Sequence, residues 1–414
     1  MTPNYLGTRC SLCAAEYPPG AVETTCPRDG GNLDVVLDIP RLARQLSPAA
    51  FAAGEASLWR YLPLLPVADP GCAGTPLRAA GWTPVFAPPA LTRAAGLERL
   101  WLKDESRNPT ASFKDRASAV VVARALEIGA GTVVTASTGN AGAALAGMAA
   151  AAGQPAVILA PRSAPPAKVA QLQVYGARVV LIDGSYDDAF DLSIAAAREL
   201  GWYCRNTGYN PFTAEGKKTA AYEIWEQVLL PAKLERPLCV FVSVGDGNII
   251  AGIHKGFRDL AELGWLEQMP RLFGVQAAGS AAVANAFFAG GETIVPVEAS
   301  TLADSISVDL PRDGLRAVRA MRSTGGRPVV VSDEQILAAI PVLGRAGIFA
   351  EPAAAAAWAG LLAAREQGLV TREDPVLVLS TGSGLKDVRA AVRAVGEPPV
   401  AAPRLDALRA ALQV

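Results

Sequence analysis

The sequence is poor in the residues from which several common sites are built. Of its 414 residues, one is a histidine, His254, and six are cysteines. A single histidine excludes every site that needs two, the HExxH zinc proteases among them. Six cysteines in so long a chain do not make a disulfide framework, and we expect a reducing, cytoplasmic environment.

The sequence also lacks an excess of charge and a long apolar run. Lysine and arginine number 38 and aspartate and glutamate 39, which argues against nucleic-acid and membrane-surface partners. The longest apolar stretch, AGAALAGMAAAAGQPAVILAP, is broken by Gly153 and Pro155, and the chain begins without an export-signal pattern. We therefore expect neither a membrane span nor export.

What the sequence does have, from about residue 100 onward, is an alternation of short β-branched runs and longer alanine-rich runs. Continuous apolar strands between helices indicate parallel sheets covered on both faces, so the predicted class is α/β, with two such sheets. The predicted strands are 132–137, 156–160, 177–183, 238–244, 272–276 and 375–380. The predicted helices are 114–128, 140–152, 165–175, 186–200, 215–229, 248–263, 334–344, 352–366 and 384–395.

The composition divides the chain into three parts. We predict a small cysteine-bearing unit at 1–36, a catalytic body at 37–397, and a proline-rich linker with a terminal helix at 398–414. Within the body, a small subdomain is expected at about 115–210, and the rest forms a large one.

Open α/β sheets bind ligands at the carboxyl ends of their strands, so the residues that follow strands are the most informative. In TASTGNAGAALAG, a strand leads into residues 137–140 and then a helix. The free amides of a helix start favour an anion such as a carboxylate, and Asn140 can donate to a phenolate-like oxygen. The structural alternative is an ordinary capped helix.

Two further strand ends have comparable signals. In FVSVGDGNIIAGIHKGF, Gly245 and Gly247 allow close approach of a phosphate to a helix start, although the spacing matches neither a Walker A loop nor GxGxxG. In LVLSTGSGLKD, the strand ends near Thr381, whose hydroxyl can hydrogen-bond a ring nitrogen. A plain strand–helix junction is again the alternative for both.

The stretch NPTASFKDRA places Lys114 at the start of an Ala/Val-rich helix, where its side chain should point inward. A buried amine is costly unless it is neutralised, paired or used as a nucleophile. Lys114 and the three strand ends together supply an amine nucleophile, a phosphate-binding loop, a donor for a ring oxygen and a hydroxyl for a ring nitrogen. These groups can hold pyridoxal phosphate as a Schiff base.

These motifs resemble those of the threonine synthase group of fold-type II pyridoxal-phosphate enzymes, in the tryptophan synthase beta-like superfamily. The resemblance covers roughly residues 80–395 and rests on LKDESRNPTASFKDRAS, STGNAGAALA, SVGDGNIIAGIHKGF and STGSGLKD, in the expected order. It implies that the cofactor lies in the cleft between two open, mostly parallel sheets covered by helices.

The resemblance also implies a role for each matched position. Lys114 would bind the cofactor and later move protons, with Asn140 at the ring oxygen and Thr381 at the ring nitrogen. The cofactor phosphate would be lined by Gly245, Asp246, Gly247, Asn248 and Ile249. The substrate carboxylate would be held by Ser137, Thr138, Gly139 and Asn140, and Lys218 stands where the family carries a lysine.

The first segment, CSLCAAEYPPGAVETTCPRDGGNLDV, resembles the zinc ribbon that precedes some members of this group. Its metal ligands would be Cys10, Cys13 and Cys26, with Asp29 in place of the expected fourth cysteine. Two interpretations stand side by side: a structural zinc site with three cysteines and one aspartate, and a ribbon that keeps its shape without metal.

Two departures from the family's pattern concern the substrate. Thr213 stands where an arginine for the substrate phosphate is usual, and losing such a contact costs about 1.5–3 kcal/mol unless Lys217, Lys218 or Arg116 replaces it. Ala111 stands where a glycine is common before the lysine motif.

The leading hypothesis is a threonine-synthase-type lyase that eliminates phosphate from O-phosphohomoserine and adds water. The alternatives are a serine/threonine deaminase, an O-phosphoserine β-replacement enzyme such as a cysteate synthase, and a catalytically dead scaffold. A dinucleotide-binding oxidoreductase is disfavoured because no GxGxxG follows the early strands. The expected partners are a small amino-acid substrate and a second copy in a homodimer.

Overall fold

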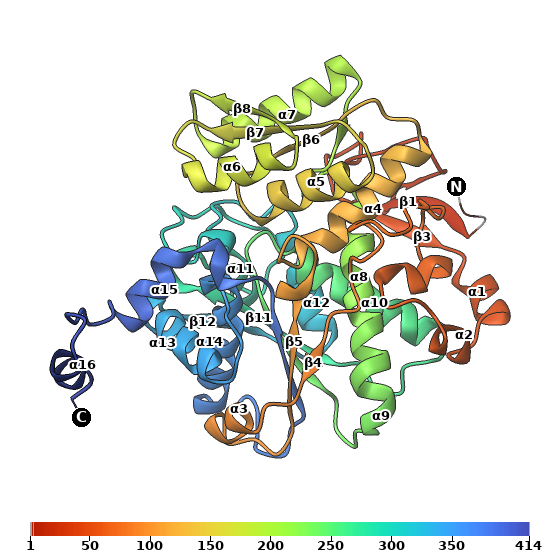
Figure 1. Ribbon diagram of the computed structural model, residues 1–414. Helices are drawn as coiled ribbons and strands as arrows, with labels where there is room; N and C mark the ends of the chain where they lie inside the picture. The colour runs from red at the N-terminus through yellow and green to blue at the C-terminus, as the bar shows by residue number, and fades with distance from the viewer. Residues whose placement is uncertain (1, 3, 414) are drawn as a thin grey trace.

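Two parallel sheets form the body of the protein in the computed structural model, which describes residue 2 and residues 4–413 (Figure 1). The large sheet has the order β12-β11-β10-β13-β5-β4, and every neighbouring pair is parallel except β4 with β5. Its strands are Pro328–Val331, Arg271–Ala277, Cys239–Ser243, Val376–Ser380, Leu100–Asp104 and Val85–Phe86. The α/β fold class is thereby confirmed.

The small sheet is parallel throughout and has the order β8-β7-β6-β9. Its strands are Arg178–Ile182, Ala156–Pro161, Val133–Ala136 and Tyr203–Cys204. The helices that pack on it are α5 (Asn140–Ala151), α6 (Pro166–Val174) and α7 (Tyr186–Leu200). This sheet and its helices lie at the top of Figure 1, above the large sheet.

A second group of helices surrounds the larger sheet. They are α10 (Asn248–Glu262), α11 (Ala282–Phe288), α12 (Gly314–Ser323), α13 (Asp333–Arg345), α14 (Pro352–Glu366) and α15 (Val388–Val395). Helix α14 contacts β10, β11, β12 and β13, and the alanine-rich sequence of this helix lets it pack closely against the strands.

Two helices connect the sheets. Helix α4 (Lys114–Glu127) packs on α8 (Phe212–Ile224), and α8 packs on α10. The predicted helix 215–229 is divided, because α8 passes into a π-helical turn, η3 (Trp225–Leu229), before the short α9 (Leu230–Ala232). Gly216 allows the close approach of α4 and α8, since a Cβ there would lie 2.0 Å from the carbonyl oxygen of Arg116.

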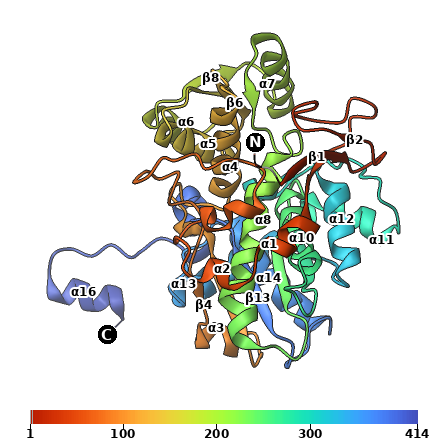
Figure 2. The ribbon, with the colours of Figure 1, turned by 90° about the vertical axis from the view of Figure 1, so that its right-hand side faces the viewer.

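The first part of the chain forms a three-stranded antiparallel sheet, β2-β1-β3 (Glu16–Tyr17, Tyr5–Cys10 and Leu33–Leu37). The arm that follows holds α1 (Ile39–Gln45), α2 (Ala49–Ala52), η1 (Leu58–Leu64) and α3 (Pro89–Ala94). Its segment η1 contacts α8 and buries Leu58, Trp59 and Tyr61 in the main core. Figure 2 shows α1 and α2 of this arm on the same side of the molecule as α8 and α10, whereas α3 lies at the bottom, near β4.

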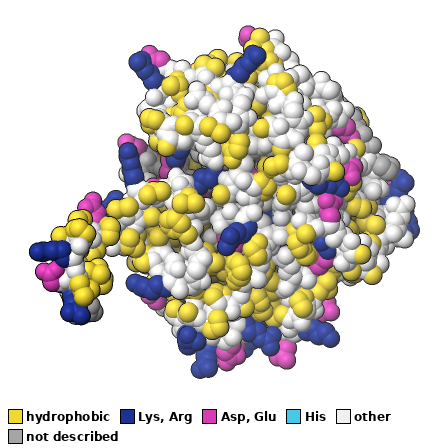
Figure 3. Space-filling model, viewed as in Figure 1, with side chains coloured by type: hydrophobic (Ala, Val, Ile, Leu, Met, Phe, Trp, Pro, Cys, Tyr) yellow, Lys and Arg dark blue, Asp and Glu magenta, His cyan; other side chains and the backbone are white. Residues whose placement is uncertain are grey.

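The C-terminal helix α16 (Leu405–Leu412) projects from the body after a proline-rich stretch (Figures 1 and 3). On the face of the molecule in Figure 3, lysine and arginine lie among aspartate and glutamate and do not form a single basic field. Within residues 2 and 4–413, none of the helices combines the length and the apolar character that crossing a membrane requires.

Candidate active site

The carboxyl ends of β6 and β10 face one cavity of about 460 Å³ between the two sheets. A second, smaller cavity continues from it toward the start of α10. Lys114 and Asp246 lie in the walls of both. A concave site of this size at strand ends is typical of small-molecule binding.

Lys114 is the first residue of α4, and its amine faces the cavity. Within the described chain, no hydrogen bond or ion pair reaches this amine. Burial is the largest influence and lowers its pKa, while the carboxylates of Glu351 and Asp246 raise it in part. An unpaired amine with a lowered pKa is suited to act as a nucleophile and as a base.

The start of α5 forms another wall of the cavity. Residues 137–140 all line it, and α5 begins at Asn140 without a side-chain cap, so its first amides remain available to an anion. The Asn140 amide donates to both carboxylate oxygens of Glu351, at 2.8 and 3.0 Å.

Glu351 is a site residue that sequence reasoning missed. It lies directly before α14, and burial raises its pKa, whereas the hydrogen bond from Asn140 and the charge of Lys114 lower it. The signal that could have found it is an acid placed immediately before a long apolar run, in GIFAEPAAAAAW.

The start of α10 forms the wall of the smaller cavity, which is lined by Gly245, Asp246, Gly247, Asn248 and Ile249. Gly247 has φ +91°, and a Cβ there would lie 2.6 Å from the carbonyl oxygen of Asp313. Helix α10 has no side-chain cap either. The two helix starts, one from each sheet, therefore present free amides to connected cavities.

The loop that carries Lys114 is tied to the end of β13. Thr381 lines the smaller cavity, and its carbonyl accepts from the backbone N–H of Phe113 at 2.9 Å. The backbone N–H of Ser383 donates to Ala111 at 3.1 Å, and Ala111 has φ +64°, a left-handed conformation that glycine adopts more easily. The two motifs are thus held together by backbone contacts.

The two adjacent lysines of α8 face different surroundings, and the expectation for Lys218 needs correction. The Lys218 amine is buried in ion pairs with Glu215 at 2.7 Å and Asp259 at 2.9 Å, and Lys218 lines neither cavity. Lys217 lines the smaller cavity, with its amine donating to Asn248 Oδ1 at 2.5 Å. Successive helical residues point about 100° apart, so only one of the pair can face the site.

Arg116, another candidate replacement for the missing arginine, is also committed elsewhere. Its guanidinium donates to the carboxylates of Glu105 and Glu223 in the core beneath the cavity. Thr213 is buried, with its hydroxyl 2.8 Å from the carbonyl oxygen of Asn210 and 3.3 Å from Asn248 Oδ1. Neither residue offers a cation to the cavity.

Arg205 is the cavity cation that sequence reasoning missed. Its side chain is 1% exposed and lines the larger cavity together with Lys114. It donates to Ser118 Oγ at 3.2 Å and to Thr207 Oγ1 at 2.9 Å, and Nη2 has no hydrogen-bond partner in the described part of the chain. Burial lowers its pKa to about 10. The signal was its place directly after the two-residue strand β9, which is too short to be recognised from the sequence.

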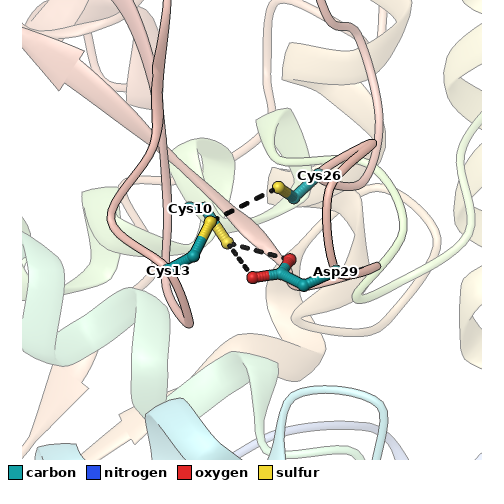
Figure 4. Close-up of side chains that lie close together, drawn as sticks. All are labelled: Cys10, Cys13, Cys26 and Asp29. Carbon is teal, nitrogen blue, oxygen red and sulfur yellow. Dashed lines mark hydrogen bonds between the residues drawn. The ribbon is translucent and has the colours of Figure 1, made fainter.

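The four predicted metal ligands converge at one end of the N-terminal sheet (Figure 4). One ligand atom from each of Cys10, Cys13, Cys26 and Asp29 can be chosen so that all four lie within 4.8 Å of one another. Cys10 Sγ is 3.3 Å from Asp29 Oδ1, and the sulfurs of Cys13 and Cys26 are 3.8 Å apart. The four residues that the sequence predicted as metal ligands therefore lie close together in the structure.

Comparison with known proteins agrees with this geometry. A family model described as "Pyridoxal-phosphate dependent enzyme" matches residues 77–382, which is most of the chain. The solved threonine deaminase isoform 2 of Solanum lycopersicum superimposes with a TM-score of 0.66 at 24% identity, covering 82% of this chain and 94% of that one. The diaminopropionate ammonia lyase of Escherichia coli also gives 0.66, at 22% identity, and covers 84% and 93%. At these identities the two structures support the fold alone.

Among curated relatives, the threonine synthase of Methanocaldococcus jannaschii is 36% identical, over 94% of this chain and 95% of its own. The threonine synthase of Methanosarcina acetivorans is 37% identical over 98% of both chains. The chain therefore belongs to the pyridoxal-phosphate-dependent enzymes and, within them, to the threonine synthase family.

Proposed function

We propose that this enzyme converts O-phosphohomoserine to L-threonine, with release of phosphate and addition of water. The observation that carries the proposal is Arg205, a buried guanidinium that has no carboxylate partner in the described chain and lies in the same cavity as Lys114. A buried unpaired cation is costly in the free protein, so its retention is explained by an anion that arrives with the substrate.

The residues around the smaller cavity fit pyridoxal phosphate. The uncapped start of α10 and the left-handed Gly247 suit its phosphate, the unpaired amine of Lys114 suits its aldehyde, and the Thr381 hydroxyl suits its ring nitrogen. When bound there, the cofactor supplies an electron sink for carbanions next to the substrate's amino group.

The chain's own groups supply positioning and proton transfer. The amides at residues 137–140 hold the substrate carboxylate against the start of α5. The Lys114 amine takes and returns protons at the substrate carbons, since its lowered pKa makes the neutral form accessible. Glu351 holds the Asn140 amide, and so keeps the carboxylate-binding loop in place.

Arg205 supplies the charge that the Thr213 position lacks. Arg205 and Thr207 both line the larger cavity and are hydrogen-bonded to each other, and the fork of a guanidinium matches phosphate geometry, so this pair can bind a phosphate there. Burial first, and then repulsion by Lys114 and Arg205, lowers the pKa of Lys217. The walls of the two cavities thus carry these three cations together with carboxylates such as that of Asp246, and we place the two phosphates, one on the cofactor and one on the substrate, next to the cations.

Three substitutions test this assignment. Arg205→Ala and Arg205→Lys are compared with Arg162→Ala, which removes an exposed arginine that lines neither cavity. Loss of a charge-assisted phosphate contact should raise the KM for O-phosphohomoserine by about 10-fold to 100-fold, with the visible absorbance of the bound cofactor retained. Arg162→Ala should leave KM unchanged. A normal KM in both Arg205 variants would contradict the role of Arg205.

A deaminase acting on L-threonine or L-serine is the second candidate, because the fold also occurs in threonine deaminase. Its substrate carries no phosphate, so Arg205→Ala should leave its turnover unchanged. Parallel assays of phosphate, 2-oxo acid and threonine release from O-phosphohomoserine, O-phosphoserine, L-threonine and L-serine separate the candidates. Oxo acid from threonine, without phosphate release from O-phosphohomoserine, would refute the synthase.

We also propose that the N-terminal sheet binds structural zinc through Cys10, Cys13, Cys26 and Asp29. Three thiolates and a carboxylate are accepted zinc ligands, and no step of the reaction is assigned to the metal. Elemental analysis of the purified protein should give about one zinc per chain, and Cys13→Ser should lower this content. A metal-free protein with an intact N-terminal sheet would support the metal-free ribbon instead.

A homodimer in a reducing cytoplasm is the proposed working state. All six cysteines are free, which suits a reducing compartment. The small sheet exposes Val180 and Leu181 of its edge strand β8, and the neighbouring helix α6 exposes Val174, so that a second copy could cover apolar side chains here. Light scattering after size-exclusion chromatography measures the mass, and a monomer at micromolar concentration would refute the dimer.

A further inference from the structure

The N-terminal sheet is joined to the two parts of the body that carry the site. Arg124 of α4, the helix that begins at Lys114, pairs with Glu23 at 2.6 Å. Arg316 of α12 pairs with Asp34. The segment thus spans from the helix of the reactive lysine to the helix beside the start of α10, a more extensive attachment than a separate small module needs.

Asp313 is the central residue of the second attachment. Its side chain is fully buried, and Oδ1 accepts from Asn32 Nδ2 at 2.9 Å and from Arg316 Nε at 2.6 Å. Asn32 Nδ2 also lies 2.7 Å from the carbonyl oxygen of Arg312. One side of this carboxylate is therefore held by the N-terminal segment.

The other side of Asp313 holds the start of α10. Oδ2 accepts from Asn248 Nδ2 at 2.6 Å, and the backbone N–H of Asp313 donates to the carbonyl of Asp246 at 2.8 Å. Gly247 packs so closely on Asp313 that a Cβ would lie 2.6 Å from its carbonyl oxygen. Asp313 is therefore joined to this loop by a side-chain and a backbone hydrogen bond and by direct packing.

The chemistry of the carboxylate fixes the direction of the Asn248 amide. An ionised carboxylate only accepts hydrogen bonds, so the amide must turn its NH₂ group toward Asp313. Its Oδ1 then faces the amine of Lys217, at 2.5 Å, and the hydroxyl of Thr213, at 3.3 Å. Asp313 thereby orients a cavity cation that it does not itself touch.

The position of Asn32 follows from the cysteine-bearing turns. Its carbonyl accepts from the backbone N–H of Ser11 at 2.9 Å, between Cys10 and Cys13. The carbonyl of the preceding Gly31 accepts from the N–H of Cys26 at 2.8 Å. The shape of the predicted metal site is therefore transmitted to Asn32 by two backbone hydrogen bonds.

We propose that Asp313 is a positioning residue through which the N-terminal segment holds the cofactor-phosphate loop and Lys217 in place. The inference rests on the proposed assignment of residues 245–249 as the cofactor-phosphate site. Its consequence is that cofactor affinity depends on Asn32, a residue that lines neither cavity.

The full-length protein provides the test. Asn32→Ala, Asp313→Asn and their combination are compared with Arg9→Ala, which removes an exposed ion pair with Glu16 from the same N-terminal sheet. The apoenzyme of each variant is titrated with pyridoxal phosphate by visible absorbance, and the ³¹P chemical shift of the bound phosphate is recorded. Asp313→Asn should weaken cofactor binding by about 10-fold to 100-fold and Asn32→Ala by about 3-fold to 10-fold, whereas Arg9→Ala should not.

The double variant distinguishes coupling from two separate defects. If both residues act through one chain of contacts, adding Asn32→Ala to Asp313→Asn should weaken binding little further, and the ³¹P shift should move in both single variants. Unchanged cofactor affinity in Asn32→Ala, or fully additive losses, would overturn the inference. If Asp313→Asn does not fold, the Asn32→Ala titration and ³¹P shift decide alone. A wild-type protein that binds no cofactor would instead refute the proposed site itself.

Discussion

Two sets of charged side chains lie in the interior of this protein and have opposite surroundings. The ionic core, beneath the cavity, consists of Lys103, Arg116, Glu105 and Glu223, all of them 0% exposed. The cavity cations are Lys114, Arg205 and Lys217, for which the described chain supplies no carboxylate partner at ion-pair distance. Lys103 and Lys114 belong to different sets although they are only eleven residues apart in the sequence.

The ionic core is complete in itself. Arg116 donates to both Glu105 and Glu223, and Lys103 pairs with Glu223 at 2.7 Å, so two positive charges meet two negative ones. It joins β5, α4 and α8. The backbone N–H groups of Trp82 and Thr83 donate to the carboxylate of Glu223, so the arm before α3 is attached to it as well. The cavity cations, by contrast, form no ion pair within the described chain. Burial alone therefore does not identify a functional lysine; burial without a partner, facing a cavity, does.

The largest expected effect comes from the cavity set. Lys114→Ala should reduce turnover of O-phosphohomoserine by about 1000-fold or more, because it removes both the nucleophile and the proton carrier. Its free energy of unfolding, measured by urea titration, should remain close to that of the wild type, since no hydrogen bond or ion pair within the described chain is lost. Retained turnover would refute the role of Lys114, and a large loss of stability would place Lys114 with the ionic core.

For the ionic core we expect a large loss of stability, which is the opposite of the expectation for Lys114. Glu223→Gln keeps the shape of the side chain but removes the charge that Lys103 and Arg116 share, and breaking a buried pair in this way costs about 3–5 kcal/mol. The same measurement on Arg205→Met, which removes a buried charge from the cavity and keeps most of the side-chain volume, should show a much smaller loss. Equal destabilisation by both substitutions would mean that the two sets do not differ in kind.

The pH dependence of the free energy of unfolding provides a second test of the role of Glu223. Burial alone would raise its pKa, but attraction to Arg116 and Lys103 lowers the pKa to about 2, from 4.5 for the free side chain. A lowered folded-state pKa contributes stability that is present above pH 4.5 and is lost as the pH falls toward 2. The stability difference between wild type and Glu223→Gln should therefore shrink over this interval. A difference that stays constant would indicate that the charge of Glu223 is not what stabilises the core.

The sequence predicted six strands of the two sheets well, because each is a continuous apolar run. It missed β5 because this strand contains a charged residue of the ionic core. The run LWLKD contains Lys103, and partners distant in the sequence, Glu223 above all, make a charged residue acceptable in a buried strand. It also missed β12, a four-residue strand that begins at Pro328.

The parts of the site that short sequence motifs encode could be predicted, whereas the parts that depend on contacts between distant residues could not. The strand ends at 137–140, 245–249 and 381, together with Lys114, are short motifs, and the structure brings them to two connected cavities. Which of Lys217 and Lys218 faces the site depends on the rotation of α8 against α10, which no local pattern records. Glu351 is defined as a site residue by its contact with the distant Asn140, and Arg205 by the lack of a partner for Nη2 within the described chain, and both are properties of the folded protein.

The smallest expected effect concerns the loop between the ionic core and Lys114. Ala111 has φ +64°, where an alanine is strained by about 1 kcal/mol relative to glycine. Ala111→Gly should relieve this strain, but glycine also gains freedom in the unfolded chain by about 0.4–1 kcal/mol, so the net change in unfolding free energy should lie within about 1 kcal/mol of zero. The informative measurement is therefore kinetic. If the strained alanine keeps Lys114 aligned with the end of β13, Ala111→Gly should lower kcat by a few fold without changing stability. An unchanged kcat would mean that the backbone hydrogen bonds of Phe113 and Ser383 are sufficient to align Lys114.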